Sequence, residues 1–192
     1  MFNEKYYKAN SIQYSMKSGE KRAQVWVETV VYTLVALAII GLFLTFAKPK
    51  IEEIQDKAIV EQSVTMLEDI NSVILTIVQG GVGNQRIIEI GIKKGDLIIN
   101  STNDQIIFQM DGRYAYTEPG ANGQQGSQVN VGNIIASTKK IGSLDEVTLI
   151  SNYSNLYNIT YQGGEDVKVL NKAPVAYKLM ITNKGNIDIS AV

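Results

Sequence analysis

One acidic side chain lies inside an apolar stretch near the start of this 192-residue chain. Glu28 follows Val25-Trp26-Val27, and residues 30–47 beyond it carry no charge. A charged side chain at the centre of a membrane helix costs about 2.5–3.5 kcal/mol on insertion scales, and less near the interface. Such a group is usually tolerated only with a partner or a function. We therefore expect Glu28 to need an ionic partner, the alternative being an interfacial acid on a simple anchor helix.

The side chains used in most hydrolytic chemistry are missing. The sequence has no cysteine and no histidine, which excludes disulfides, the usual zinc sites, cysteine nucleophiles and histidine bases. Residues 80–83 are glycine-rich but lack the lysine of a phosphate-binding loop. The net charge of -1 gives no basic surface for nucleic acid. We expect no enzyme, no cofactor, no metal site and no nucleic-acid partner.

The apolar stretch predicts a membrane-spanning helix. Residues 30–47 would extend about 27 Å at 1.5 Å per residue, close to the thickness of a bilayer core. The segment 1–23 is basic, as the positive-inside rule expects of a cytoplasmic flank. Lys48-Pro49-Lys50 ends the apolar run. Pro49 lacks a backbone N–H and is expected to kink the helix if it continues.

The pattern predicts that the helix continues to Gln79. Residues 51–79 contain no glycine or proline and are amphipathic, with apolar residues close to a 3.6-residue period. This predicted stripe consists of Ile51, Ile54, Ala58, Val64, Leu67, Val73 or Ile74, and Ile77. Residues 80–84 (GGVGN) then supply the stop. A helix over residues 24–79, apolar in 24–47 and amphipathic in 48–79, would be about 84 Å long.

Beyond residue 84 the pattern changes to the period of two that is typical of strands. Apolar residues alternate at 88–92, 106–110, 157–161 and 177–181. Turn residues separate these runs at Lys94-Gly95, Asp111-Gly112, Gly163-Gly164 and 183–186, and residues 120–128 read as a flexible surface loop. The fold class we predict is α+β: a long kinked N-terminal helix followed by an all-β, antiparallel, sandwich-like head over residues 84–192.

The residues around Glu28 carry a family resemblance. Lys21-Arg22-Ala23-Gln24 is followed by the apolar helix with its single acid, and here the sequence resembles archaeal type IV pilins with class III signal peptides. The resemblance implies cleavage between Ala23 and Gln24, which removes the basic leader 1–23. Gln24 and Glu28 match the family pattern Q-x-S-x-E, while Trp26 occupies the serine position. The resemblance covers about residues 17–79.

The resemblance also implies a function, partners and a location. The chain would be a structural subunit of an archaeal type IV pilus or related extracellular filament. It would sit in the cytoplasmic membrane as a precursor and in a cell-surface filament when mature. Implied partners are a prepilin peptidase, an assembly ATPase with its membrane platform, and identical subunits packed through residues 24–79. A minor pilin or pseudopilin would show the same residues, and so would a distant archaellin, although archaellins generally lack the acid.

Cleavage before Gln24 would give Glu28 its ionic partner. The new α-amine would have a pKa near 8 and be cationic at neutral pH. Within one helix, that amine and the Glu28 carboxylate lie about one turn apart. Between neighbouring subunits, the same pair neutralises both charges and fixes the axial offset. We therefore predict Gln24 and Glu28 as the assembly residues.

Two other fates of the apolar segment stay open. Thr45-Phe46-Ala47 resembles a small-x-small cleavage site, which would release a Sec-secreted soluble protein starting at Lys48. A single-pass anchor displaying a binding β-domain would keep the whole segment. The mature N-terminal residue separates the three: Gln24 for a pilin, Lys48 for a secreted protein and Met1 for a plain anchor.

Three N-x-S/T sequons lie beyond the membrane helix, at Asn100, Asn152 and Asn158. They are predicted to be outside the cell, where N-glycosylation occurs at surface positions. We expect Asn158 and Thr160 to share the outward face of their strand. Chance is the alternative, since a head with this composition yields a sequon or two anyway.

Overall fold

The computed structural model describes the backbone of residues 4–192 and the side chains of residues 25–192 other than Asn122. The chain divides into two compact units, Met1–Pro49 and Lys50–Val192. Helix α1 runs from Glu4 to Gln79 and contributes to both. Pro49 lies inside it, as predicted, and the kink stays a prediction. One long helix followed by strands confirms the α+β fold class.

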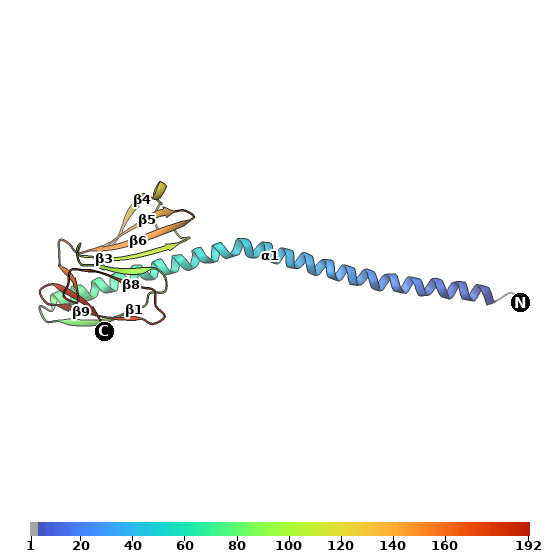
Figure 1. Cartoon of the computed structure of the whole chain (residues 1–192), viewed down its shortest axis with the longest axis horizontal. Coiled ribbons are helices and arrows are strands. Elements are labelled where there is room, and N and C mark those ends of the chain that lie inside the picture. The colour runs from blue at the N-terminus through green and yellow to red at the C-terminus, as the bar shows by residue number, and fades with distance from the viewer. Residues whose placement is uncertain (1–3) are drawn as a thin grey trace. The chain divides into compact units, whose positions relative to one another are not determined.

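Ten strands within residues 4–192 form two sheets (Figure 1). The smaller sheet has the order β1 (Gln85–Ile90), β9 (Tyr177–Asn183), β10 (Ile187–Ala191) and β7 (Ile159–Tyr161). The larger sheet has the order β4 (Gln125–Val131), β5 (Ile134–Ile141), β6 (Leu144–Asn152), β3 (Gln105–Gly112), β2 (Asp96–Asn100) and β8 (Val167–Asn171). A short 3-10 helix, η1 (Ala121–Gly123), precedes β4.

The sheets are antiparallel except at one edge. Strand β7 pairs parallel with β10, where Ile187 lies opposite Ile159, while the other strand pairs of the described head are antiparallel as predicted. Parallel strands need a long crossover. Residues 162–186 provide it, passing through β8 in the other sheet before returning as β9.

Alternating burial in the strands confirms the period-two pattern. In β3 the side chains of Ile106, Phe108 and Met110 are buried, and those of Gln105 and Gln109 face outward. The other predicted runs correspond to β1, β7 and β9, although β1 ends at Ile90 and β7 begins only at Ile159.

The second half of α1 supplies one side of the head's core. Its buried side chains recur at alternating spacings of four and three residues: Asp56, Val60, Ser63, Leu67, Ile70, Ile74 and Ile77. The five apolar ones join the inward side chains of both sheets in one apolar cluster. The predicted stripe was wrong at its start, because Ile51 and Ile54 are more than half exposed, whereas Asp56 is buried.

The glycine-rich stop ends α1 as predicted. Gly81 and Gly83 both adopt positive φ, a conformation that costs little only without a Cβ atom. The Asn84 side-chain amide donates hydrogen bonds to the carbonyls of Gly80 and Gly81, which directly follow the helix. The chain therefore leaves the helix at Gln79 and enters β1.

Two predicted turns or loops are strands instead. Asp111 and Gly112 are the last residues of β3, and residues 125–128 of the expected flexible loop belong to β4. Glycine is needed there for close approach rather than for turning. A Cβ atom on Gly126 would lie 2.1 Å from the Glu118 carbonyl oxygen. Turns are confirmed at Gly163 and Gly185, both with positive φ.

Replacing Gly126 with alanine should therefore destabilise the head. We expect Gly126→Ala to lower the free energy of unfolding by about 1–3 kcal/mol, as for other overpacked sites. Gly91→Ala is the matched control, because a Cβ there meets no described atom within 4 Å. The two variants are compared by urea unfolding of the full chain in detergent, with near-ultraviolet circular dichroism as the readout. Equal stability of the two variants would contradict the packing at Gly126.

Candidate functional site

Residues 25–46 of α1 form a wholly exposed apolar surface. Every side chain from Val25 to Phe46 is exposed, including Trp26 at 70% and Phe46 at 71%. Among the described residues, this is the helix long and apolar enough to cross a membrane, and none of its apolar window is buried. A core helix of a water-soluble protein would hide such a surface. The segment therefore needs either lipid or other apolar helices around it.

Glu28 is the acid within this surface, and Tyr32 is its partner in the same helix. The Tyr32 hydroxyl donates a hydrogen bond of 3.2 Å to Glu28 Oε1 from one turn further along. The threonines of the segment also bond internally, as Thr29 does to the Val25 carbonyl at 2.9 Å. These bonds reduce the cost of polar groups in an apolar medium. A tyrosine hydroxyl donates a hydrogen bond but is not a cation, so Glu28 has no ionic partner among the described residues of this unit.

The sequence analysis also predicted cleavage between Ala23 and Gln24 and a helix kink at Pro49. Ala23 and Gln24 lie outside the described side chains, so cleavage and the α-amine pairing stay predictions. Pro49 is the last residue of the first unit. The Tyr32–Glu28 bond was missed, although the i, i+4 spacing of an acid and a tyrosine could have revealed it.

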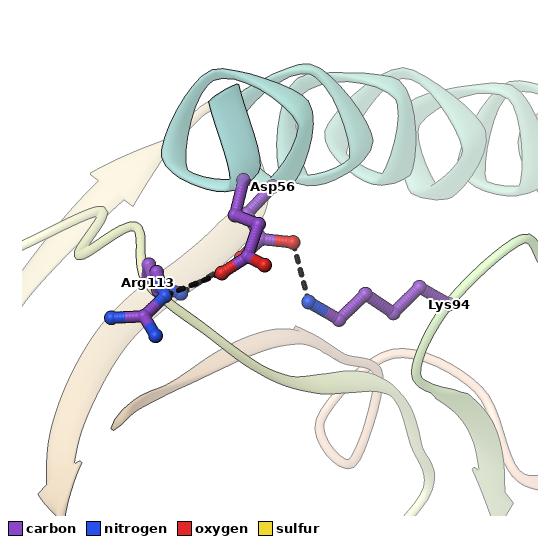
Figure 2. A network of polar contacts seen from close by, with 4 residues as sticks. Asp56, Lys94 and Arg113 are labelled. Atoms are coloured by element: carbon purple, nitrogen blue, oxygen red, sulfur yellow. Dashed lines mark hydrogen bonds and ion pairs between the residues drawn. The ribbon is translucent and has the colours of Figure 1, made fainter. Parts of the chain in front are cut away.

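The second unit contains a buried carboxylate that sequence reasoning also missed (Figure 2). Asp56 is 4% exposed and points from α1 toward two chain segments of the head. Its Oδ1 accepts a hydrogen bond from Lys94 Nζ, and its Oδ2 accepts one of 2.8 Å from the Arg113 backbone N–H. A buried carboxylate is stable only when paired in this way. We call Asp56, Lys94 and Arg113 the head anchor.

Local sequence explains why the head anchor forms. A Cβ atom on Gly112 would lie 2.6 Å from Asp56 Oδ2, so only glycine lets the end of β3 approach the helix here. Arg113 Nε also donates a 2.6 Å hydrogen bond to Glu52 Oε2, one turn before Asp56. The anchor thus holds α1 against the end of β3 and the turn before β2.

Further polar contacts hold the rest of this helix half. The Tyr153 hydroxyl donates a 3.3 Å hydrogen bond to Asn71 Oδ1, and the Asn183 amide donates one of 3.4 Å to the Ile77 carbonyl. Burial raises the pKa of Tyr153 to about 12, so its hydroxyl stays protonated and able to donate. Both contacts support the apolar stripe and do not suggest a reaction centre.

The three sequons differ in their surroundings. Asn152 is exposed at the end of β6, and Asn100 is half-buried at the end of β2. Asn158 is exposed, but Thr160 of the same sequon is only 4% exposed. The prediction that Asn158 and Thr160 share an outward face was therefore wrong.

A buried network around Asp188 explains the burial of Thr160. Asp188 Oδ1 accepts hydrogen bonds of 2.9 Å from the Thr160 hydroxyl and 2.7 Å from the Gly163 N–H, while Lys184 binds Oδ2. Burial by itself raises the pKa of Asp188. The bonds from Lys184, Gly163 and Thr160 outweigh it and lower the pKa below the usual 3.8.

Comparison of the chain with known protein families, with curated proteins and with solved structures finds no match. Its own residues therefore carry the functional argument.

Removing the Asp56 carboxylate should loosen the head. Asp56→Ala leaves the Arg113 N–H without its acceptor, and we expect a loss of about 1–3 kcal/mol in the free energy of unfolding. The control is Lys57→Ala, since Lys57 pairs only with exposed Glu61 at 3.8 Å, and exposed pairs contribute about 0–1 kcal/mol. Chemical unfolding measures the free energy of unfolding of both variants. An equal loss of stability in the two would contradict an anchoring role for Asp56.

Asp188 should make the head sensitive to acid. Because its pKa is lower in the folded state, its contribution is present above the unfolded value near 3.9 and is lost as pH falls through the folded pKa. Asp188→Asn should therefore reduce stability at neutral pH and flatten its decline in acid. Asp166→Asn, at an exposed acid, is the control. Denaturant titrations across the acid range test this, and an unchanged pH profile in Asp188→Asn would rule it out.

Proposed function

We propose that this chain is the structural subunit of an archaeal type IV pilus or a related surface filament. The observation that carries the proposal is the fully exposed apolar surface of residues 25–46, which contains Glu28 as an uncompensated charge. Lipid can cover this surface in the precursor. In a polymer, the same surface can be covered by the helices of neighbouring subunits.

Pairing of Glu28 with a cation on a neighbouring subunit would favour the polymer over lipid and would set the axial offset between subunits. The Tyr32 hydroxyl donates a hydrogen bond to Glu28 but supplies no positive charge. After cleavage between Ala23 and Gln24, the α-amine of a neighbouring chain can supply one, and in an apolar medium such a pair attracts strongly. The prepilin peptidase supplies this amine by removing residues 1–23, and the assembly ATPase and membrane platform drive insertion into the polymer.

The head anchor supports this role because it holds the strands of the head to helix α1. Val60, Leu67, Ile70, Ile74 and Ile77 of α1 belong to the core of the head, and Asp56 holds the helix to two separate head segments. Each subunit would therefore bring a head of fixed structure to the filament surface. The proposed polymer consists of apolar helices inside and β-rich heads outside.

The mature N-terminus and a Glu28 variant together test the proposal. We expect N-terminal sequencing of surface-extracted protein to begin at Gln24. We also expect Glu28→Gln to be inserted and cleaved normally but to yield few filaments by electron microscopy, because an amide cannot offset the terminal ammonium.

Two control variants separate the effect of the Glu28 carboxylate from that of its hydrogen bond and from that of other acids. Tyr32→Phe removes the intrahelical hydrogen bond but keeps the carboxylate, so filaments should still form. Glu61→Gln changes an exposed acid of the head unit and should have no effect. A mature chain beginning at Lys48 would identify a secreted protein, and one beginning at Met1 a plain anchor. Abundant normal filaments from Glu28→Gln would contradict the proposed role of Glu28 in assembly.

A further inference from the structure

The outer face of the larger sheet carries a continuous row of apolar side chains. Strand register places five residues from adjacent strands directly opposite one another: Val169, Ile98, Ile107, Ile150 and Ile135. Each of the five has a buried neighbour next to it along its strand, so these five point outward. All five are only half-buried or exposed. We call them the outer row.

Two sequon asparagines flank the outer row on the same face. Asn100 lies opposite Gln105, and Gln105 lies opposite Asn152. Asn100 is two residues beyond Ile98 in β2, and Asn152 is two residues beyond Ile150 in β6. The two asparagines are thus separated by one strand, or about 10 Å from the usual strand spacing.

The side-chain geometry leaves the reactive nitrogen of both asparagines free. Asn152 Oδ1 accepts a 3.1 Å hydrogen bond from the Ser154 N–H, and Asn100 Oδ1 accepts one of 3.2 Å from the Asn103 N–H. Within the described residues, neither Nδ2 donates a hydrogen bond. The hydroxyl residues of these sequons, Ser154 and Thr102, are exposed, and the Thr102 hydroxyl donates a 3.1 Å hydrogen bond to the Glu165 carbonyl at the surface.

The third sequon lacks this arrangement. The Thr160 hydroxyl is buried, donates to Asp188 and accepts a 3.0 Å hydrogen bond from the Asn186 side chain. An enzyme that reads the Asn158 sequon on the folded head would have to break this network first. Asn158 is exposed, but the hydroxyl that completes its sequon is not.

We propose that Asn152 and Asn100 carry N-linked glycans that lie over the outer row, and that Asn158 stays unmodified. The donor is a saccharide joined at C1 to a lipid phosphate. The Asn Nδ2 forms a bond to C1, the C1–O bond breaks with its electron pair leaving on the phosphate oxygen, and the amide loses one proton to a base of the transferase. The C–H faces of the attached sugars then cover the apolar side chains beside them.

This inference rests on the extracellular placement of the head in the proposed function, but not on polymerisation. Protease digestion of intact cells tests the placement separately. A head protected from external protease would overturn the proposed function and the glycans together. An accessible head without glycans would overturn only the glycan proposal.

Peptide mass spectrometry of the protein from its native cell surface is the direct test. We expect glycan mass on the peptides containing Asn152 and Asn100, and the unmodified mass for Asn158. Ser154→Ala and Thr102→Ala should each remove one glycan by destroying one sequon. Asn155→Gln is the matched control, an exposed asparagine outside any sequon that should leave both glycans in place. Glycan at Asn158, or none at Asn152, would overturn the assignment.

A second measurement tests coverage of the outer row. The double variant Asn100→Gln/Asn152→Gln should bind more strongly to a hydrophobic matrix, and adding Ile107→Thr should reverse the increase. The alternative occupant is a second copy of the chain. Since the sequence has no cysteine, Ile107→Cys introduces a unique thiol, and efficient disulfide formation between copies at this residue would overturn glycan coverage.

Discussion

Water cannot cover residues 25–46 without a large free-energy cost, and the rest of the structure depends on this constraint. Fifteen large apolar side chains are exposed along this segment, and each contributes about 1.5–3 kcal/mol when it is buried. An apolar environment would therefore favour them over water. The same helix continues to Gln79, and its second half supplies buried side chains to the core of the head.

The side chains of α1 differ between the two parts of the helix. From Val25 to Phe46 the helix is exposed on every side and apolar at most positions, whereas from Asp56 onward it is buried along one stripe only. Asp56 is the first buried residue of that stripe, and it is charged rather than apolar. Because Lys94 and the Arg113 N–H both reach it, the head closes around the helix with polar contacts at the end of the stripe. Gly112 permits this closure by leaving room for the carboxylate.

Sequence patterns predicted the architecture but not the contacts. The apolar run, the glycine-rich stop at residues 80–84 and the period-two alternation gave the long helix and the β-rich head. The start of the helical stripe was misread, because Ile51 and Ile54 fit the 3.6-residue period while a buried acid such as Asp56 does not look like a core residue. Gly112 was predicted to lie in a turn and Gly126 in a flexible loop, because close packing of a glycine depends on neighbours distant in sequence. The position of Glu28 in the apolar surface was predictable from local spacing, and the Asp188 network that buries Thr160 was not.

The head is built around the helix that carries it, and this has a mechanical consequence. A tension applied along α1 would act parallel to the contacts of Leu67, Ile70 and Ile74 with the sheets. In that direction the contacts are loaded in shear, all at once, whereas a domain hung on a flexible linker can be peeled open one contact at a time. A head packed on its own helix in this way should resist unfolding under tension better than a head joined to its helix by a flexible linker.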